Sequence, residues 1–214
     1  MQLSVRSVGF EDPSGGVRSG QTDVALVWQP FSTDGLEIEE LVEVERVAVL
    51  PVDHPLAGAE TLDARELAKE PFVWVEDIDP VVGDFWSLAA YRSEPLSVGA
   101  RITSFDDAFA AVRAGQAVMV PPEPLTSSLG LPGLVVRHVG GLARAVVAFC
   151  RREGDARPVV EAFAATARAC AVRDAPRGQQ PRDVGTELDR GDGDARRGSS
   201  GCRLPGAKSG AAGG

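Results

Sequence analysis

Two histidines and three cysteines are the side chains with which this sequence could most readily support nucleophilic or acid–base chemistry. Such chemistry needs a nucleophile and a base within hydrogen-bond reach of each other, and a metal site needs ligands at short spacings. His54 lies in the sequence Asp-His-Pro, which favours a turn, and His138 is distant along the chain. Cys150 falls in an apolar run and is expected to act as a small hydrophobe. The sequence therefore predicts no catalytic residue, no metal site and no enzyme.

Nucleotide and cofactor motifs are also missing from the sequence. It contains no Gly-x-Ser-x-Gly elbow, no Walker loop and no His-Glu-x-x-His zinc motif. The paired glycines Gly15-Gly16 and Gly140-Gly141 lack the strand and helix context of a phosphate loop. We therefore expect no cofactor.

Helix starts offer a different chemistry, because their free N–H groups carry a partial positive charge that can bind ligands. Ser104 with Asp107 three residues later is typical of a helix start, and Thr103 and Phe105 flank it. Asp77 and Asp79 precede a second predicted helix. For each of these residues two interpretations stay open, capping of the helix or contact with a ligand. Carboxylates at the second start would favour a cationic or neutral ligand there.

Trp28 ends a strand-like run and could present a flat apolar face to a ligand. Packing in the core is the alternative for Trp28, and we assign the other two tryptophans, Trp74 and Trp86, to packing.

Short apolar runs alternate with helix-like segments along residues 1–173. Runs that are apolar on both faces are typical of buried, mostly parallel strands, and their alternation with helices predicts an α/β fold. The predicted strands cover residues 24–28, 47–51, 71–75, 117–120, 134–136 and 145–150. The predicted helices cover residues 61–69, 80–91, 104–115 and 155–171.

Charge and hydropathy limit the partners of the chain. Its formal net charge is −9, and residues 1–173 carry 25 acidic against 15 basic side chains, a balance of −10. An acidic surface repels nucleic acid phosphate. The sequence shows neither an export signal nor an apolar stretch long enough for a membrane span, so we expect a cytoplasmic location. Residues 174–214 are rich in Gly, Arg, Asp and Pro and are predicted to be a disordered tail.

An ordered set of motifs gives the sequence a resemblance to a known family. The motifs are Gly-Val-Arg-Ser-Gly-Gln-Thr-Asp-Val-Ala-Leu from Gly16, Val-Ala-Val-Leu-Pro-Val-Asp-His-Pro-Leu-Ala from Val47, Leu-Ala-Lys-Glu-Pro-Phe-Val from Leu67, and Ser-Phe-Asp-Asp-Ala-Phe from Ser104 running to Pro121. Their order and spacing over residues 3–171 resemble the effector-binding domain of LysR-type transcriptional regulators. Each motif is weak alone, but the ordered set is specific.

The resemblance implies a type II periplasmic-binding-protein fold with two lobes of mainly parallel sheets and an effector between them. Lobe I would comprise residues 1–45 and 133–173 and lobe II residues 46–132, with a first crossing near residues 41–50. The candidate ligand-binding residues are Trp28, Asp77, Asp79, Thr103, Ser104, Phe105 and Pro121.

The resemblance also implies a strand at residues 3–8 and, upstream of residue 1, a helix-turn-helix domain and an opening β-α unit. We therefore expect the chain to be an N-terminally truncated regulator with an incomplete first lobe. Its expected partner is a small-molecule effector, with DNA reached only through the absent domain. Oligomerisation is usual in the full-length family and doubtful for this chain. A solute-binding receptor or a small-acid enzyme on the same fold are the alternatives.

Overall fold

The computed structural model describes residues 3–127 and 130–174, which belong to one compact unit. The predicted tail lies outside these ranges apart from its first residue. The strands are β1 (Val24–Gln29), β2 (Leu36–Val44), β3 (Val47–Pro51), β4 (Thr61–Asp63), β5 (Phe72–Val75), β6 (Val98–Ile102), β7 (Leu134–Gly140) and β8 (Ala145–Arg152). The helices are α1 (Ala64–Leu67), α2 (Pro80–Trp86), α3 (Phe105–Arg113), α4 (Glu123–Ser127) and α5 (Pro158–Asp174), with the short 3₁₀ turns η1 (Pro55–Gly58) and η2 (Ala89–Tyr91).

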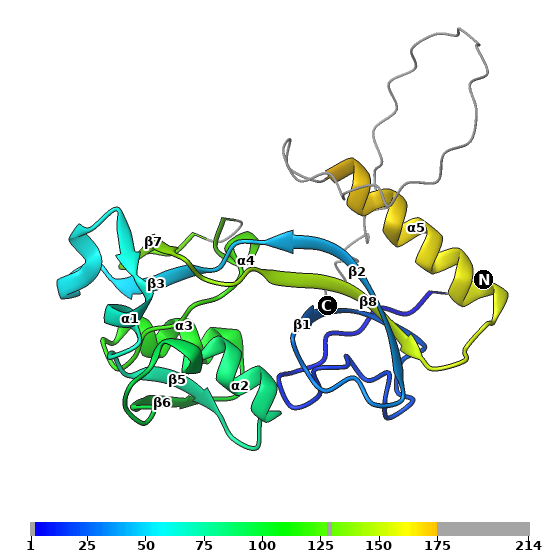
Figure 1. Cartoon of the computed structure of the whole chain (residues 1–214), viewed down its shortest axis with the longest axis horizontal. Helices are drawn as coiled ribbons and strands as arrows, with labels where there is room; N and C mark the ends of the chain where they lie inside the picture. The colour runs from blue at the N-terminus through cyan, green and yellow to red at the C-terminus, as the bar shows by residue number, and fades with distance from the viewer. Residues whose placement is uncertain (1–2, 128–129, 175–214) are drawn as a thin grey trace, which may run out of the picture. The chain divides into compact units, whose positions relative to one another are not determined.

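Lobe I is built on an antiparallel sheet in the order β1-β8-β2, with α5 against it (Figure 1). We define lobe I as the segment before β1, these three strands and α5. Val160 and Ala164 of α5 pack on Phe149 of β8, and all three are at most 2% exposed. Full burial of an aromatic side chain of this size stabilises a fold by about 2–3 kcal/mol. This contact therefore fixes α5 on the sheet.

Lobe II comprises the remaining elements, from β3 to β7. One sheet has the order β3-β7-β4, and β5 pairs with β6 in a separate parallel pair. β3 is buried along its whole length because side chains from both faces have partners. Leu50 contributes to one cluster, with Leu67 and Phe72, and Val49 to another on the opposite face of the strand.

Two short segments connect the lobes. Residues 45–46 lead from β2 into β3, and residues 141–144 lead from β7 back into β8. The two connections lie side by side (Figure 1), and Arg46 Nε donates to the carbonyl of Ala143 across them at 2.8 Å. The first crossing was expected here. Lobe I was expected to resume at residue 133, but β7 pairs with β3 and β4 and therefore belongs to lobe II.

The mixed α/β class is confirmed, whereas the expectation of mainly parallel sheets is wrong for lobe I. β2 and β8 carry the chain between the lobes in opposite directions, so they can pair only as antiparallel strands. The predicted strand at residues 3–8 is absent: Leu3 is 64% and Val5 86% exposed, and no strand pairs with them. Residues 117–120 form only isolated bridges, at Val118 and Met119.

The predicted helices begin and end at different residues. The segment 61–69 divides into β4 and α1, because Thr61 and Leu62 pair with β7 and Asp63 then caps the helix. The segment 80–91 divides at Leu88, whose φ of 61° interrupts the helix before η2. α5 begins at Pro158 and buries Val160 rather than Val159, which is 46% exposed. Among the described helices, none combines the length and the apolar character that a membrane span requires.

Candidate functional site

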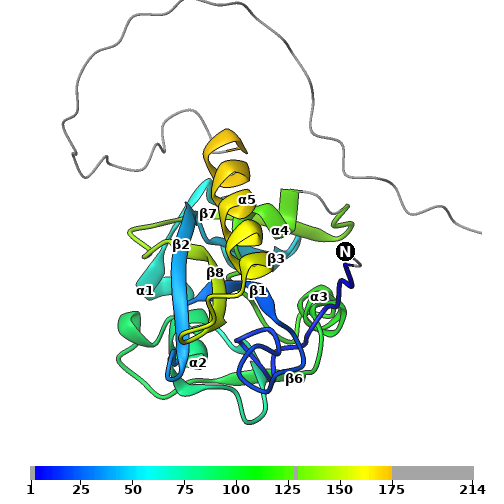
Figure 2. The ribbon, with the colours of Figure 1, turned by 90° about the vertical axis from the view of Figure 1, so that its right-hand side faces the viewer.

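A cavity of about 1070 Å³ opens between the two lobes. Lobe I supplies the segment before β1, β1 itself and the first turns of α5; lobe II supplies the end of β5, α2, the start of α3 and residues 119–122. Figure 2 shows the segment before β1 running beside α3, and the rings of Phe10 and Phe105 meet there edge to face with centroids 4.6 Å apart. Ligand sites in proteins are typically about 300–1,000 Å³, so this cavity can hold a small molecule.

All three tryptophans of the chain line this cavity. Trp28 lies on β1 opposite Val147, Trp74 lies on β5, and Trp86 ends α2. Each is only partly buried. The predicted packing role of Trp74 and Trp86 is therefore incomplete, because each also shows surface to the cavity. The sequence does not reveal this, because only the meeting of two lobes places them on the same cavity as Trp28.

α2 approaches Trp74 so closely that a side chain at Gly83 would collide with it. A Cβ built on Gly83 would lie 2.6 Å from Trp74 Cη2 and 3.1 Å from Ile78 Cγ2. Real Cβ atoms essentially never come within 3.0 Å of another heavy atom, so the contact with Trp74 would force a shift. The glycine therefore leaves room for the indole ring of Trp74 against α2.

The start of α3 forms the lobe II side of the cavity around Thr103, Ser104 and Phe105. Ser104 Oγ accepts the N–H of Asp107 at 3.1 Å, while the carboxylate of Asp107 accepts both the hydroxyl of Thr103 at 2.7 Å and its N–H at 3.2 Å. These hydrogen bonds, with the Thr103 hydroxyl as the largest cause, lower the pKa of Asp107 below its ordinary value of 3.8. An ionised carboxylate therefore offsets the positive end of α3.

Asp79 is placed outside the cavity lining, and so is Asp77. Asp79 caps α2, with Oδ1 accepting the N–H of Val81 at 2.8 Å. Its Oδ2 accepts the N–H of Ser32, which follows β1 in lobe I, at 3.1 Å. Asp79 therefore joins the two lobes, whereas Trp28, Thr103, Ser104, Phe105 and Pro121 are brought together in the cavity wall.

Arg46 lies at the first crossing and is 4% exposed. Its Nη1 donates to the carbonyl of Phe85 at the end of α2 at 2.7 Å, and its guanidinium lies 3.7 Å from the centroid of the Phe85 ring. No carboxylate of the described residues lies within ion-pair distance of this guanidinium. Burial lowers the pKa of Arg46 to about 10. Carbonyl oxygens and the face of an aromatic ring stabilise its charge in place of a carboxylate.

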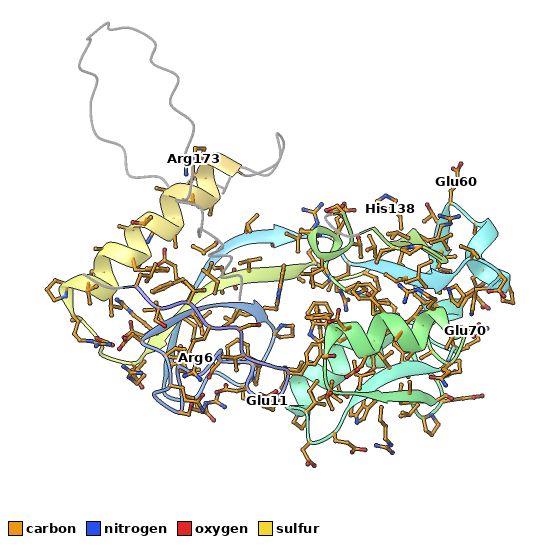
Figure 3. The ribbon with its side chains drawn as sticks, turned by 180° about the vertical axis from the view of Figure 1, so that it is seen from behind. Arg6, Glu11, Glu60, Glu70, His138 and Arg173 are labelled. Carbon is orange, nitrogen blue, oxygen red and sulfur yellow. The ribbon has the colours of Figure 1, made fainter. Side chains whose placement is uncertain are left out.

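The histidines and Cys150 lie outside the cavity lining. His54 accepts the N–H of Leu56 at Nδ1 and lies 3.5 Å from Glu70 at Nε2, whereas His138 lies 3.4 Å from Glu45. Figure 3 shows His138 and Glu70 on lobe II and Arg6 on lobe I. Burial raises the pKa of the Cys150 thiol to about 11, so its reactive thiolate form is suppressed.

Comparison with known families decides what kind of domain this is. Residues 1–171 match the LysR substrate binding domain. The chain belongs to this family. MetR of Escherichia coli, an HTH-type transcriptional regulator, is 26% identical to this LysR substrate-binding domain over an alignment of 173 residues, and the match covers 78% of this chain and 53% of MetR. YnfL of Escherichia coli is 32% identical over 83 residues, 39% of this chain and 27% of YnfL. The domain therefore spans about half the length of MetR.

Solved structures of LysR regulatory domains share the fold. The CcmR regulatory domain from Synechocystis, in complex with 2-PG, has a TM-score of 0.65 at 17% identity, with 79% of this chain and 83% of that chain covered. The reduced OxyR regulatory domain from Pseudomonas aeruginosa has a TM-score of 0.57 at 23% identity, covering 72% and 76%. The effector-binding domain of QuiR, in complex with shikimate, has a TM-score of 0.59 at 14% identity, covering 74% and 76%. The type II periplasmic-binding-protein fold expected for the LysR substrate-binding domain is thus confirmed.

Proposed function

We propose that the chain is the small-molecule-sensing domain of a LysR-type transcriptional regulator and that its effector binds in the cavity between the lobes. The observation that carries the proposal is the shared wall of this cavity, in which Trp28 of lobe I faces the same space as Thr103 and Ser104 of lobe II. A ligand that touches both walls favours one arrangement of the lobes over another, and this difference in affinity is what a sensor requires. Two of the similar regulatory domains hold a small molecule in their structures, which supports the proposal.

Within the proposal, DNA is contacted by a helix-turn-helix domain outside this chain, and the regulator acts in the cytoplasm. The relatives named as HTH-type regulators are longer than this chain and support this reading. The charge of −10 on residues 1–173 disfavours DNA binding by the sensing domain itself. A gel-shift titration of this chain at low salt should show no sequence-specific complex that survives competitor DNA.

The experiment that tests effector binding is a thermal-shift screen of small acids, amines and neutral aromatics. A ligand present at 100 times its Kd stabilises the folded state by about 2.7 kcal/mol, which raises the Tm of a domain of this size by roughly 5–10 °C. Trp28→Ala should abolish the shift, and Ser104→Ala should reduce it. Val52→Ala, at an exposed residue outside the cavity, is the control and should leave the shift intact. A shift unchanged in both cavity variants would reject the site.

A further inference from the structure

The walls of the cavity are aromatic on both lobes. Besides the three tryptophans, Phe10 and Phe163 line it from lobe I and Phe105 lines it from lobe II. Phe105 is 40% exposed even though it contacts Phe10. Aromatic side chains attract other rings by stacking or by edge-to-face contact. An occupant that reaches both walls therefore meets ring faces and edges on each side.

Charged groups on the walls are few, and they are mostly negative. The charged lining residues among the described ones are Arg6, Asp12 and Asp23. Asp23 is paired with Arg157 at 2.7 Å, and Asp12 accepts hydrogen bonds from the N–H groups of Ser14 and Gly16. Arg6 lies on the exposed segment before β1 (Figure 3). An anion bound in the cavity would therefore find one cationic lining side chain, the solvent-exposed Arg6, and no buried cation among the described residues.

The hydrogen-bond donors of Thr103, just before α3, are already taken by a carboxylate of the protein itself. Asp106 and Asp107 stand in the first turn of α3, and Asp107 takes up the hydroxyl and the N–H of Thr103. A ligand carboxylate placed beside Thr103 would compete for the same donors and lie next to a like charge, which is unfavourable. The same negative charge favours an ammonium group and leaves a neutral molecule unaffected.

We infer that the effector is a flat aromatic molecule without net negative charge, which stacks between Trp28 and the lobe II tryptophans with any cationic or hydrogen-bond-donating group directed toward the start of α3. This inference rests on the proposed function, because it names the ligand class of that same cavity.

The probes for the test share one ring system and carry a neutral, a cationic or an anionic group on it: 2-naphthylmethanol, 2-naphthylmethylamine and 2-naphthoate. The full chain is labelled with 5-fluorotryptophan, which gives one ¹⁹F resonance for each of its three tryptophans. Trp28→Phe, Trp74→Phe and Trp86→Phe assign the resonances. The neutral and cationic probes should shift the resonances of Trp28, Trp74 and Trp86 with a Kd at least tenfold lower than that of the carboxylate.

A charge variant separates electrostatics from shape. Asp107→Asn keeps the size of the side chain and should improve binding of 2-naphthoate several-fold while leaving 2-naphthylmethanol unchanged. Asp84→Asn removes a charge from a residue outside the cavity and should alter neither Kd. If the carboxylate binds as tightly as the other probes, the inferred ligand class is wrong and binding in the cavity stands. If no probe shifts any resonance at millimolar concentration, the inference is also wrong, and the thermal-shift screen then decides separately whether the proposed function survives.

Discussion

The carboxylate of Asp79, at the start of α2 in lobe II, accepts a hydrogen bond from the backbone N–H of Ser32 in lobe I at 3.1 Å. The same carboxylate caps α2 through Val81. One side chain therefore both begins a helix and links the lobes, at a position where the sequence suggested a contact with the effector.

Replacement of Asp79 should lower the free energy of unfolding by more than the loss of a helix cap alone would. Loss of an N-cap carboxylate lowers the free energy of unfolding by about 1 kcal/mol, and the lost link to Ser32 should add to this value. Asp63→Ala, which removes the cap of α1 without an interlobe bond, is the matched control. Urea unfolding should show Asp79→Ala to be the less stable of the two variants, and hydrogen exchange should be faster at Ser32 only in Asp79→Ala. Equal effects on stability and on Ser32 would show that the link contributes nothing.

The contribution of Asp79 should depend on pH. Burial alone would raise the pKa of this carboxyl, but hydrogen bonds from Ser32 and from the N–H groups of Val81 and Val82 outweigh it and leave the pKa below 3.8. A depressed pKa stabilises the fold at pH values above the unfolded pKa near 3.8, and this stabilisation is lost as the pH falls through the folded pKa. The difference in unfolding free energy between the wild type and Asp79→Asn should therefore be constant from pH 5 to 7 and should shrink below about pH 4. A difference that grows on acidification would have the wrong sign.

Arg46 should not tolerate replacement by lysine. A lysine keeps the charge, but its single ammonium cannot reproduce the planar fork that serves Ala143 and Phe85 together. We expect Arg46→Lys to lower the free energy of unfolding by about 1–3 kcal/mol, in the range for a broken buried hydrogen-bond network. Arg65→Lys, on an exposed helix position, should change it by less than about 0.5 kcal/mol. Chemical denaturation of both variants measures the difference, and equal stabilities would contradict the role assigned to Arg46.

Gly83→Ala should be destabilising even though alanine is the better helix former. The gain in helix propensity is at most about 1 kcal/mol, whereas forcing a methyl group against Trp74 costs about 1–3 kcal/mol. Gly58→Ala, where an added Cβ meets nothing within 4 Å, is the control. Thermal unfolding should show a lower Tm only for Gly83→Ala, together with a changed fluorescence of Trp74. A Tm at or above that of the wild type would mean that Trp74 moves aside without cost.

The strands that the sequence predicts correctly are those that are apolar on both faces. β3 is the clearest case, because every one of its residues is buried. β2 escaped prediction because Glu37, Glu39, Glu40 and Glu43 interrupt its apolar residues, and its pairing with β8 depends on a partner more than 100 residues away. The segment at residues 3–8 shows the converse, since strand-like residues without a neighbouring strand remain irregular.

The candidate site was predictable only where it depends on local structure. Ser104 could be placed at a helix start from its spacing to Asp107, and the structure has it there as the N-cap. Asp79 shows the same pattern of a residue before a helix, but its carboxylate turns toward Ser32 instead of the cavity. The direction in which a capping side chain points is set by the neighbouring lobe, and no spacing within one helix contains that information.

The two connections at residues 45–46 and 141–144 limit how the molecule can move. Each residue contributes two soft backbone torsions, so six residues hold about a dozen torsions between the lobes. Arg46 ties the two connections together beside Phe85 and removes part of that freedom. We therefore expect any motion of the lobes to be close to a rotation about an axis near the Arg46 guanidinium. A molecule bound far from this axis has the longer lever arm, so small forces at the rim of the cavity produce the largest change in the angle between the lobes.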